Sequence, residues 1–162
     1  MKKTARAALL VSFALYAADP PMMKEGLWSV HTVSIDNPGN RRIEGTRSLC
    51  RDHAYDTRMR VQAEERQKQI CKPVLRTSSG ASFTENSECT IQGSVVTSKV
   101  IATYTGGTSI HSETHGTYKP ALNGMEEITM IMDQKYVGAC PAGMEPGDFM
   151  SADGKVTHVR HP

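Results

Sequence analysis

The chain has 162 residues, with 19 Lys and Arg against 17 Asp and Glu and a formal net charge of +2. The first 18 residues hold three of the basic residues and none of the acidic ones, so the other 144 residues carry 16 basic and 17 acidic side chains. Such a balance lacks the clustered positive charge that nucleic acids and anionic membranes attract, so both are set aside as partners. The length predicts one domain with a core of ordinary size.

The N-terminus has the pattern of a secretory signal peptide over residues 1–18. Basic residues precede an apolar run of 12 residues, Ala7 to Ala18, and the chain turns polar at Asp19. The run is shorter than the roughly 18 to 20 residues that a membrane-spanning helix needs. We therefore predict a periplasmic or secreted protein, cleaved near Ala18, with no integral membrane segment after cleavage.

Four cysteines follow this segment: Cys50, Cys71, Cys89 and Cys140. In an exported chain an even number of cysteines predicts disulfides, and four cysteines allow three pairings. Their order along the chain favours bonds between Cys50 and Cys71 and between Cys89 and Cys140. A metal site built from the thiols is the weaker interpretation, because no C-x-x-C pair occurs and an oxidising compartment disfavours free thiolates.

The next part of the chain predicts a β-hairpin followed by a helix. Residues 26–35 are rich in β-branched and aromatic side chains, residues 36–40 have the composition of a turn, and residues 41–50 form the return strand. Residues 51–70 contain no Gly or Pro and many Arg, Gln, Glu and Ala, which predicts a long helix with a charged outer side.

Short strands separated by turn residues fill the rest of the chain. Consecutive strands with short turns predict an antiparallel meander, and a twisted meander of six to eight strands tends to curl toward a barrel or half-barrel. We therefore expect a mainly β fold of this kind with one inserted α-helix. It would form a single β-rich domain over residues 19–145, followed by a loosely ordered tail over residues 146–162. The predicted strands are residues 74–77, 82–91, 94–105 and 108–118, and the stretch 124–141 that closes the sheet.

The last of these strands has the clearest alternation of side chains. Ile128, Met130 and Met132 lie on one face of an extended chain. Together with Trp28 and Val30 of the first strand, they are the candidates for a pocket that binds a small apolar ligand. The alternative is that all five pack the core, which is the usual place for such side chains.

Two other kinds of site are compatible with the sequence. Met130 and Met132 offer the thioether ligands that suit Cu(I), so copper handling is the second hypothesis. An enzyme is the third, and it would need a cleft that brings His31, Glu113 and His115 together. No nucleophile elbow, phosphate loop or dinucleotide fingerprint occurs, so we predict no catalytic residue and no cofactor.

His111 and His115 have a spacing that places two imidazoles together on a helix. Here the context predicts a strand, in which four residues span about 13 Å. Two ligands of one zinc ion lie within about 4 Å of each other, so this pair predicts no zinc site.

Short motifs follow one another in a particular order along the chain. They are K-E-G-L-W-S-V from Lys24, a first cysteine before a helical segment, C-K from Cys71, the segment Phe83 to Cys89, and G-A-C-P ending at Pro141. Together they resemble the bacterial exported family catalogued as domain of unknown function 3617. Members often have Asp at the place of Ala139 and methionine-rich segments before the helix, which this chain lacks. The resemblance implies an exported, disulfide-bonded envelope protein and supplies no established activity.

A second similarity concerns Gly26-Leu27-Trp28, which resembles the G-x-W that opens the first strand of lipocalin-type barrels. It favours a curled sheet. The function that we expect from the sequence is binding, either of a small apolar molecule on the concave face of the sheet or of another envelope protein.

Overall fold

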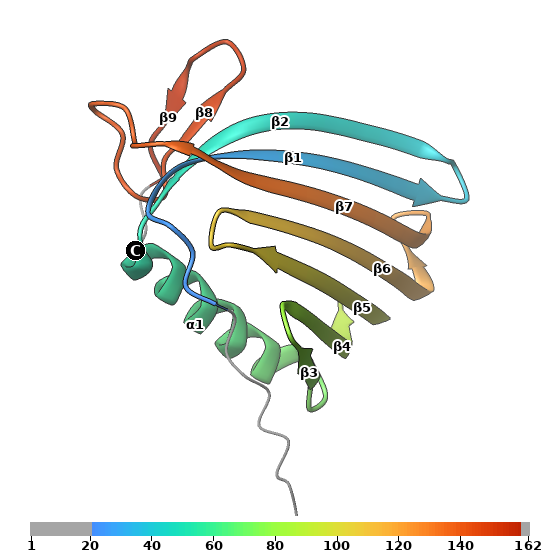
Figure 1. The fold of residues 1–162 in the computed structure, drawn as a ribbon. Coiled ribbons are helices and arrows are strands. Elements are labelled where there is room, and N and C mark those ends of the chain that lie inside the picture. The colour runs from blue at the N-terminus through green and yellow to red at the C-terminus, as the bar shows by residue number, and fades with distance from the viewer. Residues whose placement is uncertain (1–20, 160–162) are drawn as a thin grey trace, which may run out of the picture.

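The computed structural model describes residues 21–159, so the predicted signal peptide lies outside the described residues. Within this range the chain forms nine strands and one helix (Figure 1), and no helix is long and apolar enough to cross a membrane. In chain order the elements are β1 (Gly26–Asn37), β2 (Arg41–Arg51), α1 (His53–Ile70), β3 (Leu75–Ser79), β4 (Ser82–Ile91), β5 (Ser94–Thr105), β6 (Ser109–Leu122), β7 (Met125–Gly138), β8 (Phe149–Ser151) and β9 (Val156–Thr157).

The nine strands form one antiparallel sheet in the order β3-β4-β5-β6-β7-β1-β2-β8-β9. The predicted meander is confirmed from β3 to β7, where each strand pairs with the next. The predicted hairpin of β1 and β2 is confirmed as well. β7 lies between β6 and β1 and pairs with both, so this strand joins the meander to the hairpin.

The predicted closure into a barrel or half-barrel is wrong, because the sheet is open (Figure 1). Closure would require β2 to approach β3. Helix α1 connects these two strands, and its 18 residues span about 27 Å. The helix therefore holds the two sides of the sheet apart, and the barrel that the similarity to lipocalin-type proteins suggested is not formed by the described strands.

The predicted pairing of the cysteines is also wrong. Cys50 bonds to Cys140, with their Cα atoms 5.6 Å apart, and Cys71 bonds to Cys89. The first bond ties the end of β2 to the segment after β7, and the second ties the end of α1 to β4. Pairing by order along the chain fails because α1 carries Cys71 away from Cys50.

The segment from residue 146 onward, which we expected to be loosely ordered, adds β8 and β9 beside β2. Asp148 holds this segment in place, and it is only 3% exposed. Its carboxylate accepts hydrogen bonds from the backbone N–H of Glu145 at 2.7 Å and of Val159 at 3.3 Å, and it lies 2.8 Å from Nδ1 of His158. The sequence of this segment gave no sign of the buried contact.

The face of the sheet that lies against α1, called the helix-side face below, carries the core. Its first cluster contains Met23, Trp28 and Ile110, and its second contains Val30, Leu49 and Tyr55. Trp28 is fully buried, and its indole N–H donates to the carbonyl of Lys24 at 2.8 Å. Because Tyr55 belongs to the helix, the second cluster fixes the first turn of α1 to the sheet.

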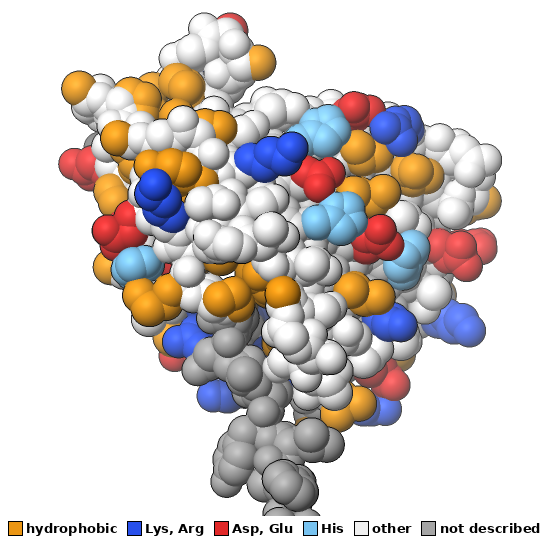
Figure 2. Space-filling view, viewed as in Figure 1, with side chains coloured by type: hydrophobic (Ala, Val, Ile, Leu, Met, Phe, Trp, Pro, Cys, Tyr) orange, Lys and Arg blue, Asp and Glu red, His pale blue; other side chains and the backbone are white. Residues whose placement is uncertain are grey.

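The opposite face, called the outer face below, mixes polar and apolar side chains, and it includes Val33 of β1, which is buried. Figure 2 shows histidines and acidic side chains grouped on it, with apolar side chains between them. His31, Asp133 and His111 lie abreast on β1, β7 and β6, because the register places Asp133 opposite both histidines. No helix of the described chain covers this face, so these side chains remain in contact with solvent.

Candidate ligand-binding site

A pocket lies between the segment before β1, the first turns of α1 and the helix-side face of the sheet. Its volume is about 470 Å³, which is within the range of pockets that hold small organic molecules. The residues that line it are Pro21, Met22, Met23, Arg51, His53, Asp56, Thr57, Arg60, Tyr104 and Ile110.

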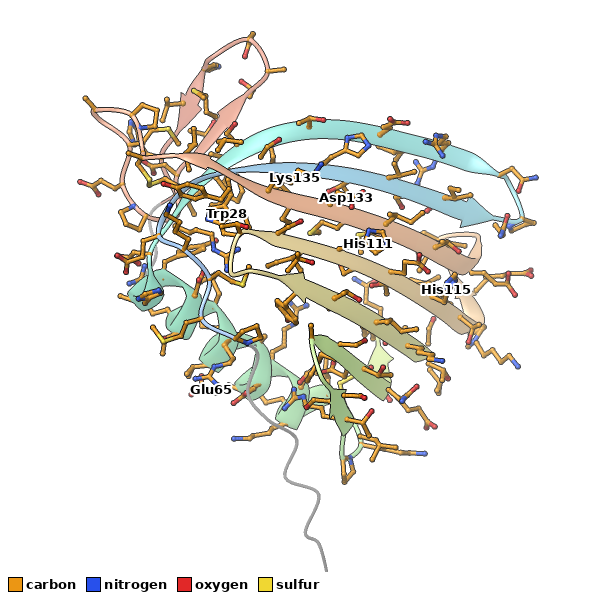
Figure 3. The ribbon with its side chains drawn as sticks, in the orientation of Figure 1. Trp28, Glu65, His111, His115, Asp133 and Lys135 are labelled. Atoms are coloured by element: carbon orange, nitrogen blue, oxygen red, sulfur yellow. A yellow bond between two sulfur atoms is a disulfide. The ribbon has the colours of Figure 1, made fainter. Side chains whose placement is uncertain are left out.

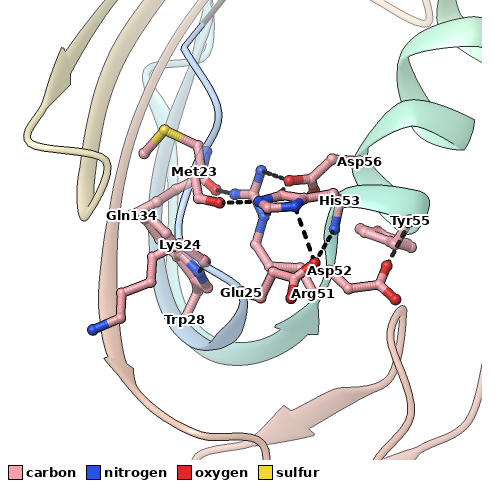
Figure 4. Close-up of polar contacts among 10 residues, drawn as sticks. All are labelled: Met23, Lys24, Glu25, Trp28, Arg51, Asp52, His53, Tyr55, Asp56 and Gln134. Carbon is pink, nitrogen blue, oxygen red and sulfur yellow. Dashed lines mark hydrogen bonds and ion pairs between the residues drawn. The ribbon is translucent and has the colours of Figure 1, made fainter.

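The start of α1 is fixed by contacts that also shape one wall of the pocket (Figure 4). Asp52 is the N-cap, and its carboxylate accepts a hydrogen bond from the N–H of Tyr55 at 2.6 Å. Such a cap satisfies one of the free N–H groups of the first turn. The N–H of His53 donates to the carboxylate of Glu25 at 3.1 Å, and its Nε2 lies 2.9 Å from the carbonyl of Met23. The segment before β1 is thus tied to the helix.

Arg51 is the charged group on the inner side of the pocket. Its guanidinium lies 4.9 Å from the centre of the Trp28 ring and donates to the carboxylate of Asp56 at 2.9 Å and to the amide oxygen of Gln134 at 3.3 Å. The side chain is 12% exposed. Stacking on an aromatic ring together with a paired carboxylate offsets the loss of water around this guanidinium.

The rest of the pocket is largely apolar. Met23 and Ile110 are buried, whereas Met22 is 73% exposed at the pocket. Burial raises the pKa of the Tyr104 phenol, and the positive charge of Arg51 opposes that shift. The phenol is therefore neutral at ordinary pH and offers one hydroxyl beside the apolar wall. The pocket combines an apolar surface with the Arg51–Asp56 ion pair, the side chains of His53 and Arg60, and the hydroxyls of Thr57 and Tyr104.

The structure places the five predicted pocket residues on the helix-side face. Trp28 and Val30 are buried in the two core clusters, and Met132 packs against the second. Met130 lies beside Met132 on β7, and Ile128 borders a hollow that residues of β4, β5, β6 and β7 line. None of the five belongs to the lining of the pocket beside Arg51.

Trp28 nevertheless contributes indirectly, because it packs against Met23 and Ile110, which do line the pocket. Trp28 thus supports two lining residues without lining the pocket itself. Direct contact between a ligand and any of the five predicted residues stays a prediction.

The copper hypothesis also stays a prediction. The sulfur of Met132 accepts a hydrogen bond from the side chain of Gln134 at 3.4 Å. Within residues 21–159, no three His, Cys, Asp or Glu side chains are arranged so that they could hold a metal ion. In the copper hypothesis Met130 and Met132 would supply the thioether ligands.

The three residues named for an enzyme share the outer face, as expected from their positions on β1 and β6. Each has a different neighbour. His31 lies 3.5 Å from Glu44, Glu113 lies 3.3 Å from His111, and His115 lies 3.2 Å from the hydroxyl of Thr129.

His111 and Asp133 form a pair that the sequence did not suggest. Nδ1 of His111 lies 2.8 Å from the Asp133 carboxylate, and Figure 3 shows the two side chains on neighbouring strands. This hydrogen bond, followed by the one with Glu113, raises the pKa of His111. The two residues are 22 positions apart, so only the register of β6 and β7 reveals them.

The pocket residues were also missed from the sequence. Met22 precedes the first strand, Arg51 ends β2, Asp56 lies in α1 and Tyr104 lies near the end of β5. The one local signal was Asp52 before a helix, since Asp favours the N-cap position. Nothing in the sequence connects that helix start with Tyr104.

Comparison with known proteins agrees with the motifs described above. The family model described as "Protein of unknown function (DUF3617)" matches residues 23–140, which includes β1 to β7, α1 and all four cysteines. No curated protein and no solved structure matches the chain. The chain belongs to the DUF3617 family.

Proposed function

We propose that this protein is an exported binding protein whose pocket beside Arg51 takes a small molecule with an apolar body and a polar end. The observation that carries the proposal is the pocket itself, about 470 Å³ in volume, with Met22, Met23 and Ile110 on one side and the Arg51–Asp56 pair on the other. The two disulfides support an oxidising location outside the cytoplasm.

The character of the lining suggests the chemistry of the ligand. Met22 lines the pocket and is largely exposed, and a flexible thioether side chain adapts to apolar molecules of different shapes. The guanidinium groups of Arg51 and Arg60 lie on the lining beside this surface, and the Asp56 carboxylate pairs with Arg51. An acceptor group at one end of the ligand, such as a carboxylate or sulfonate, matches this arrangement.

A probe titration tests the proposal. Protein purified from the periplasm is titrated with 1-anilinonaphthalene-8-sulfonate, a fluorescent molecule with an apolar body and one sulfonate. The Thr57→Trp variant places a large side chain at the pocket from the exposed surface of α1, so it removes no core contact. We expect probe affinity to fall at least about tenfold, which corresponds to about 1.4 kcal/mol.

The matched control is Ala63→Trp, which adds the same side chain to an exposed position of α1 away from this pocket. It should leave probe affinity unchanged, and both variants should keep the unfolding midpoint of the wild type. Equal affinity in all three proteins would contradict the proposal. Native mass spectrometry before and after denaturation then shows whether a natural ligand copurifies, as a mass that denaturation removes.

A further inference from the structure

The edge of β2 that faces away from β1 has no neighbouring strand along part of its length. β8 pairs only with residues 47–49 of β2, as Figure 1 shows at one end of that strand. Among the described residues, no strand pairs with residues 41–46 on that side. All six are exposed, and Ile43 exposes 54% of its surface. Unpaired edges of this kind are templates for another strand.

We propose that this edge pairs with the same edge of a second copy, antiparallel and about a two-fold axis at Ile43. In that register Arg42 lies opposite Glu44 of the second copy, and Glu44 lies opposite its Arg42. Two ion pairs form, related by the axis, and the two Ile43 side chains face each other. The edge is self-complementary in charge, as a two-fold interface requires.

Contacts within one chain already show the geometry that this pairing uses. Nη2 of Arg42 donates to the Glu44 carboxylate at 2.7 Å, so both side chains lie on the outer face of the sheet. They are 54% and 47% exposed. On adjacent antiparallel strands, residues directly opposite have Cβ atoms about 4.5 to 5.5 Å apart, so the same groups can pair between copies.

The neighbouring positions accommodate this register. Arg41 lies opposite Gly45 of the second copy, and no atom lies within 4 Å of the place where a Cβ on Gly45 would be. The space beside Gly45 is therefore open to the longer side chain. Arg41 also keeps its own partner, Asp36, within the chain.

The other edge of the sheet lacks this complementarity. β3 contains Arg76 and no acidic residue, and Nε of Arg76 lies 2.8 Å from Glu85 in the same chain. Pairing β3 with β2 of another copy would be head-to-tail and would give an assembly that grows without limit. The charge pattern of β2 favours a closed dimer over that assembly.

Sedimentation velocity over a range of protein concentrations tests the proposal. We expect a concentration-dependent monomer–dimer equilibrium in the wild type. The Glu44→Arg variant places Arg side chains opposite each other twice, and the dimer should weaken about tenfold or more, since each of the two pairs changes from attractive to repulsive. The double variant Arg42→Glu/Glu44→Arg exchanges the charges, keeps every opposite pair and should restore dimerisation.

Two further measurements locate the contact. Hydrogen exchange of the amides of residues 41–46 should slow as dimer forms. The control is Glu88→Arg on β4, which disrupts an exposed ion pair with Lys72, and this variant should dimerise like the wild type. A monomer at every concentration, a mass that rises beyond the dimer, or failure of the double variant to recover would overturn the proposal. Binding of the fluorescent probe should be the same in Glu44→Arg and wild type, so the two proposals are tested separately.

Discussion

The helix-side and outer faces of the sheet are made by alternating residues of the same strands, yet they have different physical roles. On β7, Met132 packs into the core while its neighbour Asp133 bonds to a histidine on the outer face. On β1, Trp28 is fully buried, whereas His31 is half-buried beside Glu44. The difference shows that packing against α1 constrains only one of each pair of neighbours.

This difference has a consequence for stability. A side chain on the helix-side face loses apolar burial and leaves a cavity when it is truncated. A polar pair on the outer face exchanges its contacts for water at little cost. Substitutions that alternate along one strand should therefore alternate in effect. Four experiments measure contacts of the helix-side face and of the outer face, and the first of them compares two neighbours on one strand.

The largest effect is expected for Trp28→Ala. The indole is fully buried between Met23 and Ile110, so its removal should lower the free energy of unfolding by about 3 to 5 kcal/mol. Urea denaturation measures the change. The control is Ser29→Ala, the next residue on the same strand, which should change stability by less than about 0.5 kcal/mol. Similar losses in both variants would contradict the distinction between the faces.

The next effect is expected for Cys71→Ala/Cys89→Ala. Cys89 lies on the helix-side face of β4, so its bond with Cys71 attaches the end of α1 to that face. The two cysteines are 18 positions apart, and opening a loop of this length costs about 3 kcal/mol.

Hydrogen exchange should show where that stability is lost. Amides in the last turns of α1 should exchange faster in the double variant, whereas those around Tyr55, which is held by the core, should change less. Uniformly faster exchange along α1 would show that the disulfide and the core anchor act on the helix as one unit.

A smaller effect is expected for Arg51→Met. The variant keeps much of the side-chain length on the Trp28 ring but leaves the Asp56 carboxylate, 26% exposed, without its cation. We expect a loss of about 1 to 2 kcal/mol in urea denaturation. Arg47→Met is the control, because Arg47 also lies over an aromatic ring, Phe149, but is exposed. An equally large loss of stability in the control would mean that burial of the Arg51–Asp56 pair does not increase its contribution to stability.

The smallest effect concerns His111 and its dependence on pH. Its hydrogen bond to Asp133 raises the pKa in the folded state above about 6.5, the value expected for the unfolded chain. The stability from this bond is thus fully present below about pH 6.5 and is lost as the pH rises through the folded pKa. The side chain is 47% exposed, so the contribution should stay below about 1 kcal/mol.

The measurement compares wild type with His111→Gln at pH 5.5 and pH 8.5. The advantage of the wild type should shrink at the higher pH, and Asp133→Asn should show the same pattern. An advantage that grows with pH would show that the neutral imidazole is the better partner of Asp133.

Local patterns in the sequence predicted most of the elements. Alternation within residues 124–141 and the glycine-containing turns of the meander predicted the strands, and the absence of Gly and Pro from residues 51–70 predicted the helix, which the structure places at His53–Ile70. These patterns depend on neighbours in sequence, so one chain is enough to reveal them.

Contacts between distant segments could not be predicted in the same way. The cysteine bonds and the open sheet depend on where α1 directs the chain after β2. The pocket depends on Met22, Arg51 and Tyr104 meeting in space. The five residues predicted for a pocket do share one face, but alternation cannot show which part of that face α1 covers.

Helix α1 also affects which cysteines can bond to each other while the chain is being oxidised. When a chain is exported N-terminus first, Cys50 and Cys71 are the first two thiols to appear. In the native structure these two cysteines are not bonded to each other. Exchange between thiols and disulfides is required to correct a bond formed between them. A helix of 18 residues that forms early separates the two thiols by about 27 Å and prevents that bond. A formed α1 thereby keeps Cys50 apart from Cys71, and Cys50 stays available for Cys140, the last cysteine to emerge.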